Sequence, residues 1–214
     1  MKKRENIVII VILVVLVISI VGVSYAAFSY TREGTGVNKI TTGDLSMEYT
    51  ESDNVISISN ALPTTDRTGM VRLTKGEYFD FTITSSISNN TNINYEISAK
   101  EEGNGTIDGS NIKLYLTEIV DGEERSLMNP KVYSEEATSN DYTGRPASEM
   151  SLYQSTMNSS EEHHYRLRMY VDEEYNPQGD GGGLTFAVRV NVYGMVGDIN
   201  TSQVNTPELD SNMI

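Results

Sequence analysis

The stretch LTFAVRVNV, from Leu184 to Val192, carries an apolar side chain at every second position. Successive side chains of a β-strand point to opposite faces of a sheet, so the apolar side chains of this stretch share one face. The residues are Leu184, Phe186, Val188, Val190 and Val192. This period of two predicts a half-buried strand, which is the unit from which an all-β fold is built.

The same alternation recurs in the chain before this stretch. It appears in Leu45–Tyr49, Phe79–Ile83, Ile93–Ala99, Ile112–Leu116 and Tyr165–Val171. We expect the polar residues between these apolar positions to face water, among them Arg166, Arg168, Thr185 and Arg189. Half-buried strands of this kind are typical of antiparallel sheets.

Polar, turn-rich stretches separate these strands. They include 101–109, Asp121-Gly122 and Asn176–Gly183, and we interpret the last as the loop of a hairpin between two strong strands. Residues 133–160 are ambiguous, since they fit a long loop, a short helix or an insertion. The pattern predicts an antiparallel β-sandwich over residues 27–197, followed by a polar, flexible tail over 198–214.

The N-terminus has the pattern of an export segment. Lys2-Lys3-Arg4 precedes an apolar run from Ile7 to Val23, which is close to the length needed to cross a bilayer. Small residues Ser24 and Ala26 then form an acceptable cleavage site before Ala27. Residues 1–26 are therefore either a cleaved signal peptide or an uncleaved transmembrane helix that anchors the chain.

Charge and composition exclude several classes of function. The formal net charge is −14, and an acidic domain repels phosphate backbones, so nucleic acid is not an expected partner. The chain has no cysteine, which excludes disulfides, thiolate zinc sites and cysteine nucleophiles.

The sequence shows no recognisable catalytic motif. The two histidines, His163 and His164, are adjacent and would point to opposite faces of a strand, unlike the HExxH motif of zinc peptidases. The acidic segment Asp172–Asp180 is either a calcium loop or a solvated hairpin, and Pro177 stands where an EF-hand needs glycine. We predict no catalytic residues, no cofactor and no metal site, and a peptidase is the least favoured function.

Three short motifs follow one another near the N-terminus. They are GVSYAAF (Gly22–Phe28), TGDLSM (Thr42–Met47) and VISISN (Val55–Asn60), and Leu62-Pro63 follows them. This order resembles the TasA/camelysin family of exported Gram-positive proteins. The resemblance covers about 22–63, and it departs from the family pattern at Thr64, where the family has glycine.

The resemblance implies a jelly-roll-like sandwich, export through a dedicated signal peptidase, and assembly into biofilm matrix fibres. In that family the mature N-terminal segment inserts as a strand into the next subunit, and here it would be the arm 27–40. The composition of the arm is consistent with an inserted strand, since Phe28, Val37 and Ile40 are apolar positions on an otherwise polar segment. A first strand of the chain's own domain and a plain linker are the alternatives for this arm.

We therefore expect a structural fibre subunit at the cell surface or outside the cell. Its partners would be further copies of itself or related matrix subunits, and the membrane while the leader is attached. The alternative is a membrane-anchored surface domain that binds a ligand or host partner through loops such as 133–160.

Overall fold

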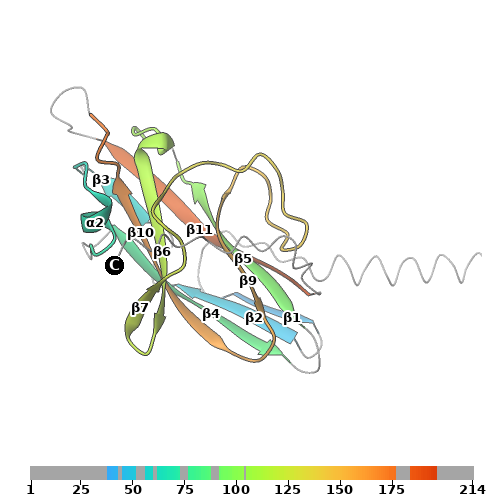
Figure 1. Cartoon of the computed structure of the whole chain (residues 1–214). Coiled ribbons are helices and arrows are strands. Elements are labelled where there is room, and N and C mark those ends of the chain that lie inside the picture. The colour runs from blue at the N-terminus through green and yellow to red at the C-terminus, as the bar shows by residue number, and fades with distance from the viewer. Residues whose placement is uncertain are drawn as a thin grey trace, which may run out of the picture.

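The computed structural model shows a sandwich of two antiparallel β-sheets with almost no helix (Figure 1). It describes residues 38–42, 45–51, 56–59, 62–72, 77–87, 92–103, 105–176 and 184–196. The leader 1–26, most of the arm 27–40 and the tail 198–214 lie outside these ranges. In the described part of the chain, no helix has the length and apolar character needed to span a membrane.

The larger sheet has seven strands in the described residues. Its order is β1 (Asn38–Thr42), β2 (Leu45–Glu51), β4 (Tyr78–Ile87), β10 (Glu162–Val171), β6 (Ile112–Val120) and β7 (Glu123–Ser126), and β8 (Lys131–Val132) also pairs with β6. A short helix, α2 (Asp66–Gly69), and a 3-10 turn, η1 (Gly109–Asn111), connect strands.

The smaller sheet has four strands in the described residues. Its order is β3 (Ile56–Ser59), β11 (Thr185–Val196), β5 (Ile93–Glu101) and β9 (Met150–Met157). The chain changes sheet repeatedly, so strands that follow one another in sequence are often not paired.

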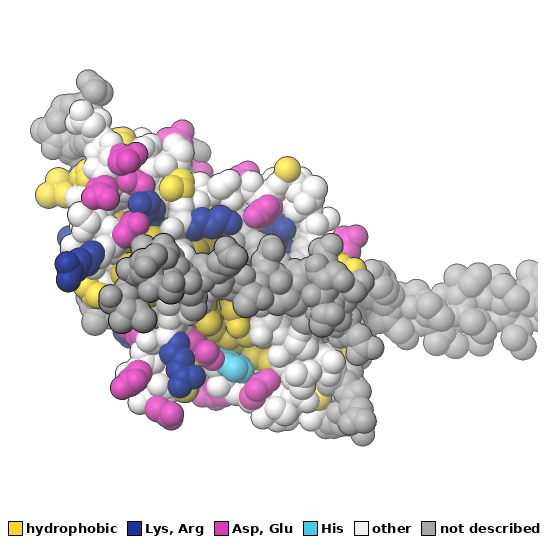
Figure 2. Space-filling model, viewed as in Figure 1, with side chains coloured by type: hydrophobic (Ala, Val, Ile, Leu, Met, Phe, Trp, Pro, Cys, Tyr) yellow, Lys and Arg dark blue, Asp and Glu magenta, His cyan; other side chains and the backbone are white. Residues whose placement is uncertain are grey.

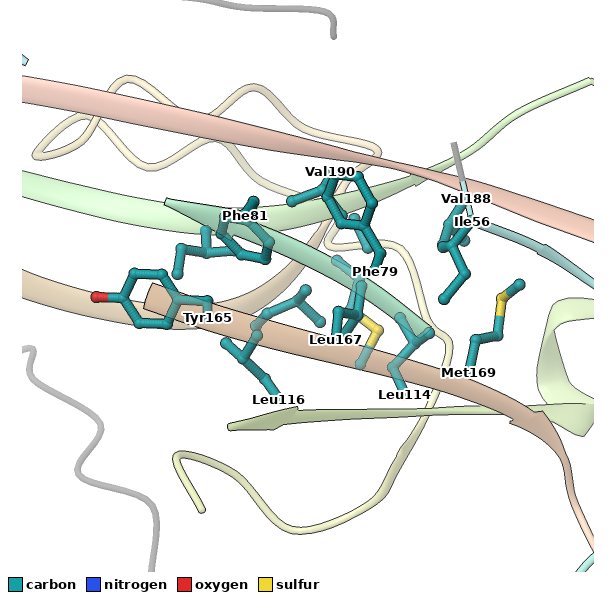
Figure 3. Close-up of a cluster of buried hydrophobic side chains, with 14 of the residues drawn as sticks. Ile56, Phe79, Phe81, Leu114, Leu116, Tyr165, Leu167, Met169, Val188 and Val190 are labelled. Carbon is teal, nitrogen blue, oxygen red and sulfur yellow. The ribbon is translucent and has the colours of Figure 1, made fainter. Parts of the chain in front are cut away.

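The hydrophobic core lies between the two sheets (Figure 3). Phe79 and Phe81 of β4 and Leu167 of β10 lie across from Val188 and Val190 of β11, and all five are buried. Burying one such side chain stabilises the fold by about 1.5–3 kcal/mol. The alternation predicted for these strands is confirmed, because the apolar positions face the core and their neighbours face outward.

The predicted hairpin between β10 and β11 is wrong. β10 pairs with β4 on one side and β6 on the other, so neither of its edges is free for the next strand. β11 lies instead in the smaller sheet, between β3 and β5. The connection that contains Asn176–Gly183 therefore crosses from one sheet to the other.

A genuine two-residue hairpin joins β6 to β7. Asp121 and Gly122 have φ of 55° and 84°, and Val120 pairs with Glu123. Positive φ at both central residues is the requirement of a type I′ turn, which aspartate and glycine meet at low cost. The turn expected at Asp121-Gly122 is confirmed.

Two other expectations need correction or completion. Arg168 does not face water, because its side chain is only 3% exposed and binds Glu124 and the carbonyl of Arg72. The ambiguous segment 133–160 begins as a long loop and ends in strand β9, which the sequence pattern did not reveal.

Candidate functional site

A long loop at residues 133–149, between β8 and β9, lies against the outer face of the smaller sheet; we call it the anchored loop. Its backbone closes on itself, since the Glu136 N–H donates to the Glu149 carbonyl at 3.2 Å. Farther along, the Asn140 N–H donates to the Arg145 carbonyl at 2.8 Å. These bonds satisfy backbone groups that neither sheet can pair.

Glu96 of β5 is the first of two carboxylates that hold this loop. It is completely buried, and Oε1 accepts from Arg145 Nε at 2.7 Å and Gln154 Nε2 at 3.2 Å. Oε2 accepts from Asn140 Nδ2 at 2.9 Å and from the Thr143 hydroxyl. A buried carboxylate is tolerated only with such complete pairing, so the loop and the sheet depend on each other.

Glu149, at the end of the anchored loop, is the second carboxylate. It is 3% exposed, and Oε1 accepts from the Tyr193 hydroxyl at 2.8 Å and Asn191 Nδ2 at 3.1 Å. Oε2 accepts from the Ser98 hydroxyl. The loop is therefore attached to β11 as well as to β5, and its conformation is fixed at two points.

The start of the loop is held by Tyr133. Its hydroxyl accepts from the Glu101 N–H at 2.8 Å, and its ring packs edge-on against Phe186 with centroids 5.5 Å apart. Burial raises the pKa of Tyr133 to about 12. A Cβ at Gly109 would come within 2.6 Å of the tyrosine ring, so glycine is the residue that fits there.

Two shallow depressions adjoin the anchored loop. One of about 340 Å³ is lined by Asn140, Asp141, Tyr142 and Gln154 among others, and Tyr142 is 43% exposed. Another of about 720 Å³ lies near Tyr133 and is lined partly by acidic side chains. A rigid polar rim with an exposed aromatic is the kind of surface that contacts a partner.

The sheet edges are the second candidate surface. β1 and β9 each pair with one strand among the described residues, β2 and β5 respectively. In β1, Ile40 stands opposite Met47 of its own chain, so the last residues of the arm form the edge of the larger sheet.

The remaining residues predicted for cleavage and assembly lie outside the described ranges. They are Ser24, Ala26, Ala27, Phe28 and Val37.

The outer face of the larger sheet carries a chain of ion pairs. Arg166 binds both carboxylate oxygens of Asp80, at 2.6 and 2.7 Å, and donates to Glu124 at 2.7 Å. Arg168 binds Glu124 through two bonds of 2.6 and 2.9 Å, and this lowers the pKa of Glu124 to about 2. The network links β10 to the β6–β7 hairpin. Figure 2 shows, for one face of the molecule, that basic and acidic side chains are interspersed.

The two histidines point to opposite faces, as predicted. His163 Nδ1 lies 2.6 Å from Glu118, on the side of the core, and His164 Nδ1 lies 2.9 Å from the Thr82 hydroxyl on the outer face. Each is engaged by its own neighbours, so the structure does not bring them together at one centre.

The acidic segment after β10 is partly occupied by internal bonds. Asp172 binds Lys113 Nζ at 3.1 Å and accepts from the Glu174 N–H, and this backbone bond lowers the pKa of Asp172. Across the part of the chain that the structure describes, no group of three or more His, Cys, Asp or Glu side chains has metal-binding geometry. Asp180 lies outside that part.

Sequence reasoning missed Glu96 and Glu149, the two residues that organise this surface. Within β5, Asn94, Glu96 and Ser98 have the spacing of a solvated face. The available signal was the length of the polar segment before β9, because connections longer than about 12–15 residues within a compact domain are uncommon.

Comparisons with known proteins identify no family. No family model matches the chain, and no curated protein matches it. Among solved structures, a β-glucosidase from Kluyveromyces marxianus matches with a TM-score of 0.23 and 12% identity over 81% of this chain. The chain spans 21% of that protein, and a likeness this weak supports no argument about fold or activity.

Proposed function

We propose that this protein is a structural subunit of extracellular matrix fibres, assembled when the mature N-terminal arm of one copy adds as a strand to the next. The observation that carries the proposal is the position of β1, which is formed from the end of the arm and lies at the edge of the larger sheet. A segment that precedes an edge strand leaves the domain at its periphery, where it can reach a neighbour.

Strand addition suits a domain of this construction. Main-chain hydrogen bonds to an open sheet edge supply affinity, and alternating side chains set the register. A donor segment and an acceptor edge at different places on one subunit make a head-to-tail contact, which does not close and therefore builds a filament. The proposal includes a jelly-roll-like fold, cleavage of 1–26 before Ala27 and no enzymatic activity.

A second candidate is favoured by the anchored loop. Buried Glu96 and Glu149 hold this loop in one conformation, and a pre-organised loop binds a partner with little loss of entropy. In this case Ile7–Val23 would remain as an anchor, and the exposed Tyr142 would contact a ligand or host partner.

The test compares the mature chain 27–214 with a variant that lacks 27–37 and keeps β1 intact. We expect the parent to form filaments in electron micrographs and the deletion to remain a folded monomer by light scattering and circular dichroism. A chain that lacks the tail 198–214 is the matched control, and it should polymerise. Filaments of unchanged length from the arm deletion would refute strand donation.

The N-terminus of the native protein separates the two candidates. Mass spectrometry should find a start at Ala27 or Phe28 in extracellular material if the arm is donated. A start at Met1 or Lys2 in membranes would instead support the anchored surface domain.

A further inference from the structure

The edge strands of the two sheets differ in their chemistry. Proteins protect edge strands from pairing with other chains by making them short or by placing charges on them. β7 contains Glu123, Glu124 and Arg125, β1 contains Lys39, and β8 contains Lys131. β3 has no charged residue, but it is only 4 residues long. Each of these four edges therefore carries one of the usual protections.

β9 is neither short nor charged, and its pairing with β5 is regular apart from one register shift next to Ile97 and Ser98. It is 8 residues long, and its sequence MSLYQSTM contains no charged residue, no proline and no glycine. Among the described residues β9 pairs with β5 alone, so the main-chain groups of its other side have no strand partner there. A long uncharged edge with open main-chain groups is a template for strand addition.

Side-chain contacts on both faces hold β9 in its extended conformation. On its outer face, Gln154 donates to Glu96 at 3.2 Å and Thr156 donates to the Asn94 side chain at 3.2 Å. On its inner face, Met157 is completely buried in the core. An acceptor strand that is fixed on both faces loses little conformational freedom when another strand binds it.

The arm has the length and composition of a matching strand. Residues 27–37 read AFSYTREGTGV, and extended at ~3.3 Å per residue they span about 36 Å, against about 26 Å for β9. Phe28 and Tyr30 alternate with small polar residues, and the charges of Arg32 and Glu33 cancel. The arm leads into β1 of the larger sheet, whereas β9 borders the smaller sheet, so donor and acceptor belong to different edges.

We propose that β9 is the acceptor edge for strand donation, and that residues 27–37 of a second copy pair with it as a fifth strand of the smaller sheet. This inference rests on the proposed fibre function and names the surface that the fibre contact uses. The contact is heterologous, because the arm of each copy occupies the β9 edge of the next copy.

Cysteine cross-linking tests this directly, because the chain has no cysteine of its own. The mature chain 27–214 would carry Thr156→Cys on β9 together with Ser29→Cys, Thr31→Cys or Thr35→Cys on the arm. The matched control places the acceptor cysteine at Ser57 (Ser57→Cys), on the opposite edge of the same sheet. Filaments would be oxidised, dissolved in detergent without reductant and separated by size.

We expect a ladder of covalent multimers from at least one arm partner of Thr156→Cys and none from Ser57→Cys. A ladder from Ser57→Cys alone would overturn the β9 assignment and leave the fibre function intact. Cross-linked monomers from Thr156→Cys would show that the arm pairs within its own chain. Failure of the unmodified mature chain to form filaments would refute the proposed function itself.

Adding a charge to the edge provides an independent readout. Thr156→Lys should reduce filament mass at least about tenfold, because a lysine on an edge strand opposes pairing. Ser57→Lys, at an exposed position of β3, should leave filament mass unchanged. Thermal melts of both variants would establish that each is folded, and normal filaments from folded Thr156→Lys would overturn the inference.

Discussion

The outer faces of both sheets carry ion pairs between glutamate and arginine, but these pairs lie in opposite environments. On the smaller sheet, Glu96 and Arg145 form a pair whose side chains are 0% and 6% exposed, beneath the anchored loop. On the larger sheet, Glu124 binds two arginines while its own side chain stays 29% exposed. The first pair is sealed by protein, and the second remains in contact with water.

This difference decides how much each pair matters to the fold. A buried carboxylate must be fully paired, so removal of its partner is severe, whereas a solvated one is screened and can bind water instead. The smaller sheet therefore holds a loop that cannot move without breaking the buried pair. The larger sheet holds only a short hairpin, and the Glu124 carboxylate at its centre stays within reach of water although Arg168 is buried.

The largest effect is expected at the buried pair. Glu96→Ala leaves the Arg145 guanidinium buried without its carboxylate and removes the acceptor of Thr143, so the free energy of unfolding should fall by about 3–5 kcal/mol. Urea unfolding followed by circular dichroism measures this change. The double variant Glu96→Ala/Arg145→Ala should lose less than the sum of the single losses, because no orphaned charge remains.

A loss below about 1 kcal/mol from Glu96→Ala would contradict this account, because that is the range of solvated pairs. It would mean that the anchored loop can leave the sheet at little cost. The second candidate function would then lose the rigid surface on which it depends.

An intermediate, pH-dependent effect is expected at Glu124. Its pKa is lowered from 4.5 to about 2 in the folded protein, mainly by the hydrogen bond from Arg168. A carboxyl whose folded pKa lies below its unfolded value stabilises the fold above pH 4.5, and this contribution is lost as the pH falls toward 2. Because the group is partly solvated, Glu124→Gln should cost only about 1 kcal/mol at pH 7 and almost nothing at pH 2.

Chemical denaturation of both proteins across this pH range measures the difference. Glu123→Gln, one residue earlier on the same strand and exposed, serves as the control for removing a negative charge from β7. If the two variants lost stability equally at pH 7, the network around Arg168 would not be the cause.

The sequence was sufficient to predict the core strands but not to predict which strands pair with each other. Alternation in 79–83, 93–99 and 186–192 correctly predicted which apolar side chains face the core, because side-chain period is a local property. The β10–β11 hairpin was predicted wrongly because pairing depends on which edges are already occupied. β10 is paired on both sides by strands much earlier in the chain, which no local pattern encodes.

The buried carboxylates show the same limit for the candidate site. Glu96 sits among alternating polar residues and has the pattern of a water-facing position. It is buried only because Arg145 and the rest of the anchored loop, far along the chain, cover that face. The acceptor edge proposed for β9 differs from these carboxylates, because its lack of charged residues can be read from the sequence once β9 is known to be an edge strand.

The smallest effect is expected at an exposed pair on the same sheet as Glu96. Glu102 binds Arg189 at 2.8 and 3.0 Å, but its side chain is 39% exposed. Glu102→Gln should lower the free energy of unfolding by at most about 0.5–1 kcal/mol, and the loss should shrink in about 0.5 M salt, where solvated charges are screened. The loss from Glu96→Ala should not depend on salt. Because both glutamates bind an arginine on the outer side of one sheet, equal losses would mean that burial by the anchored loop is not what separates them.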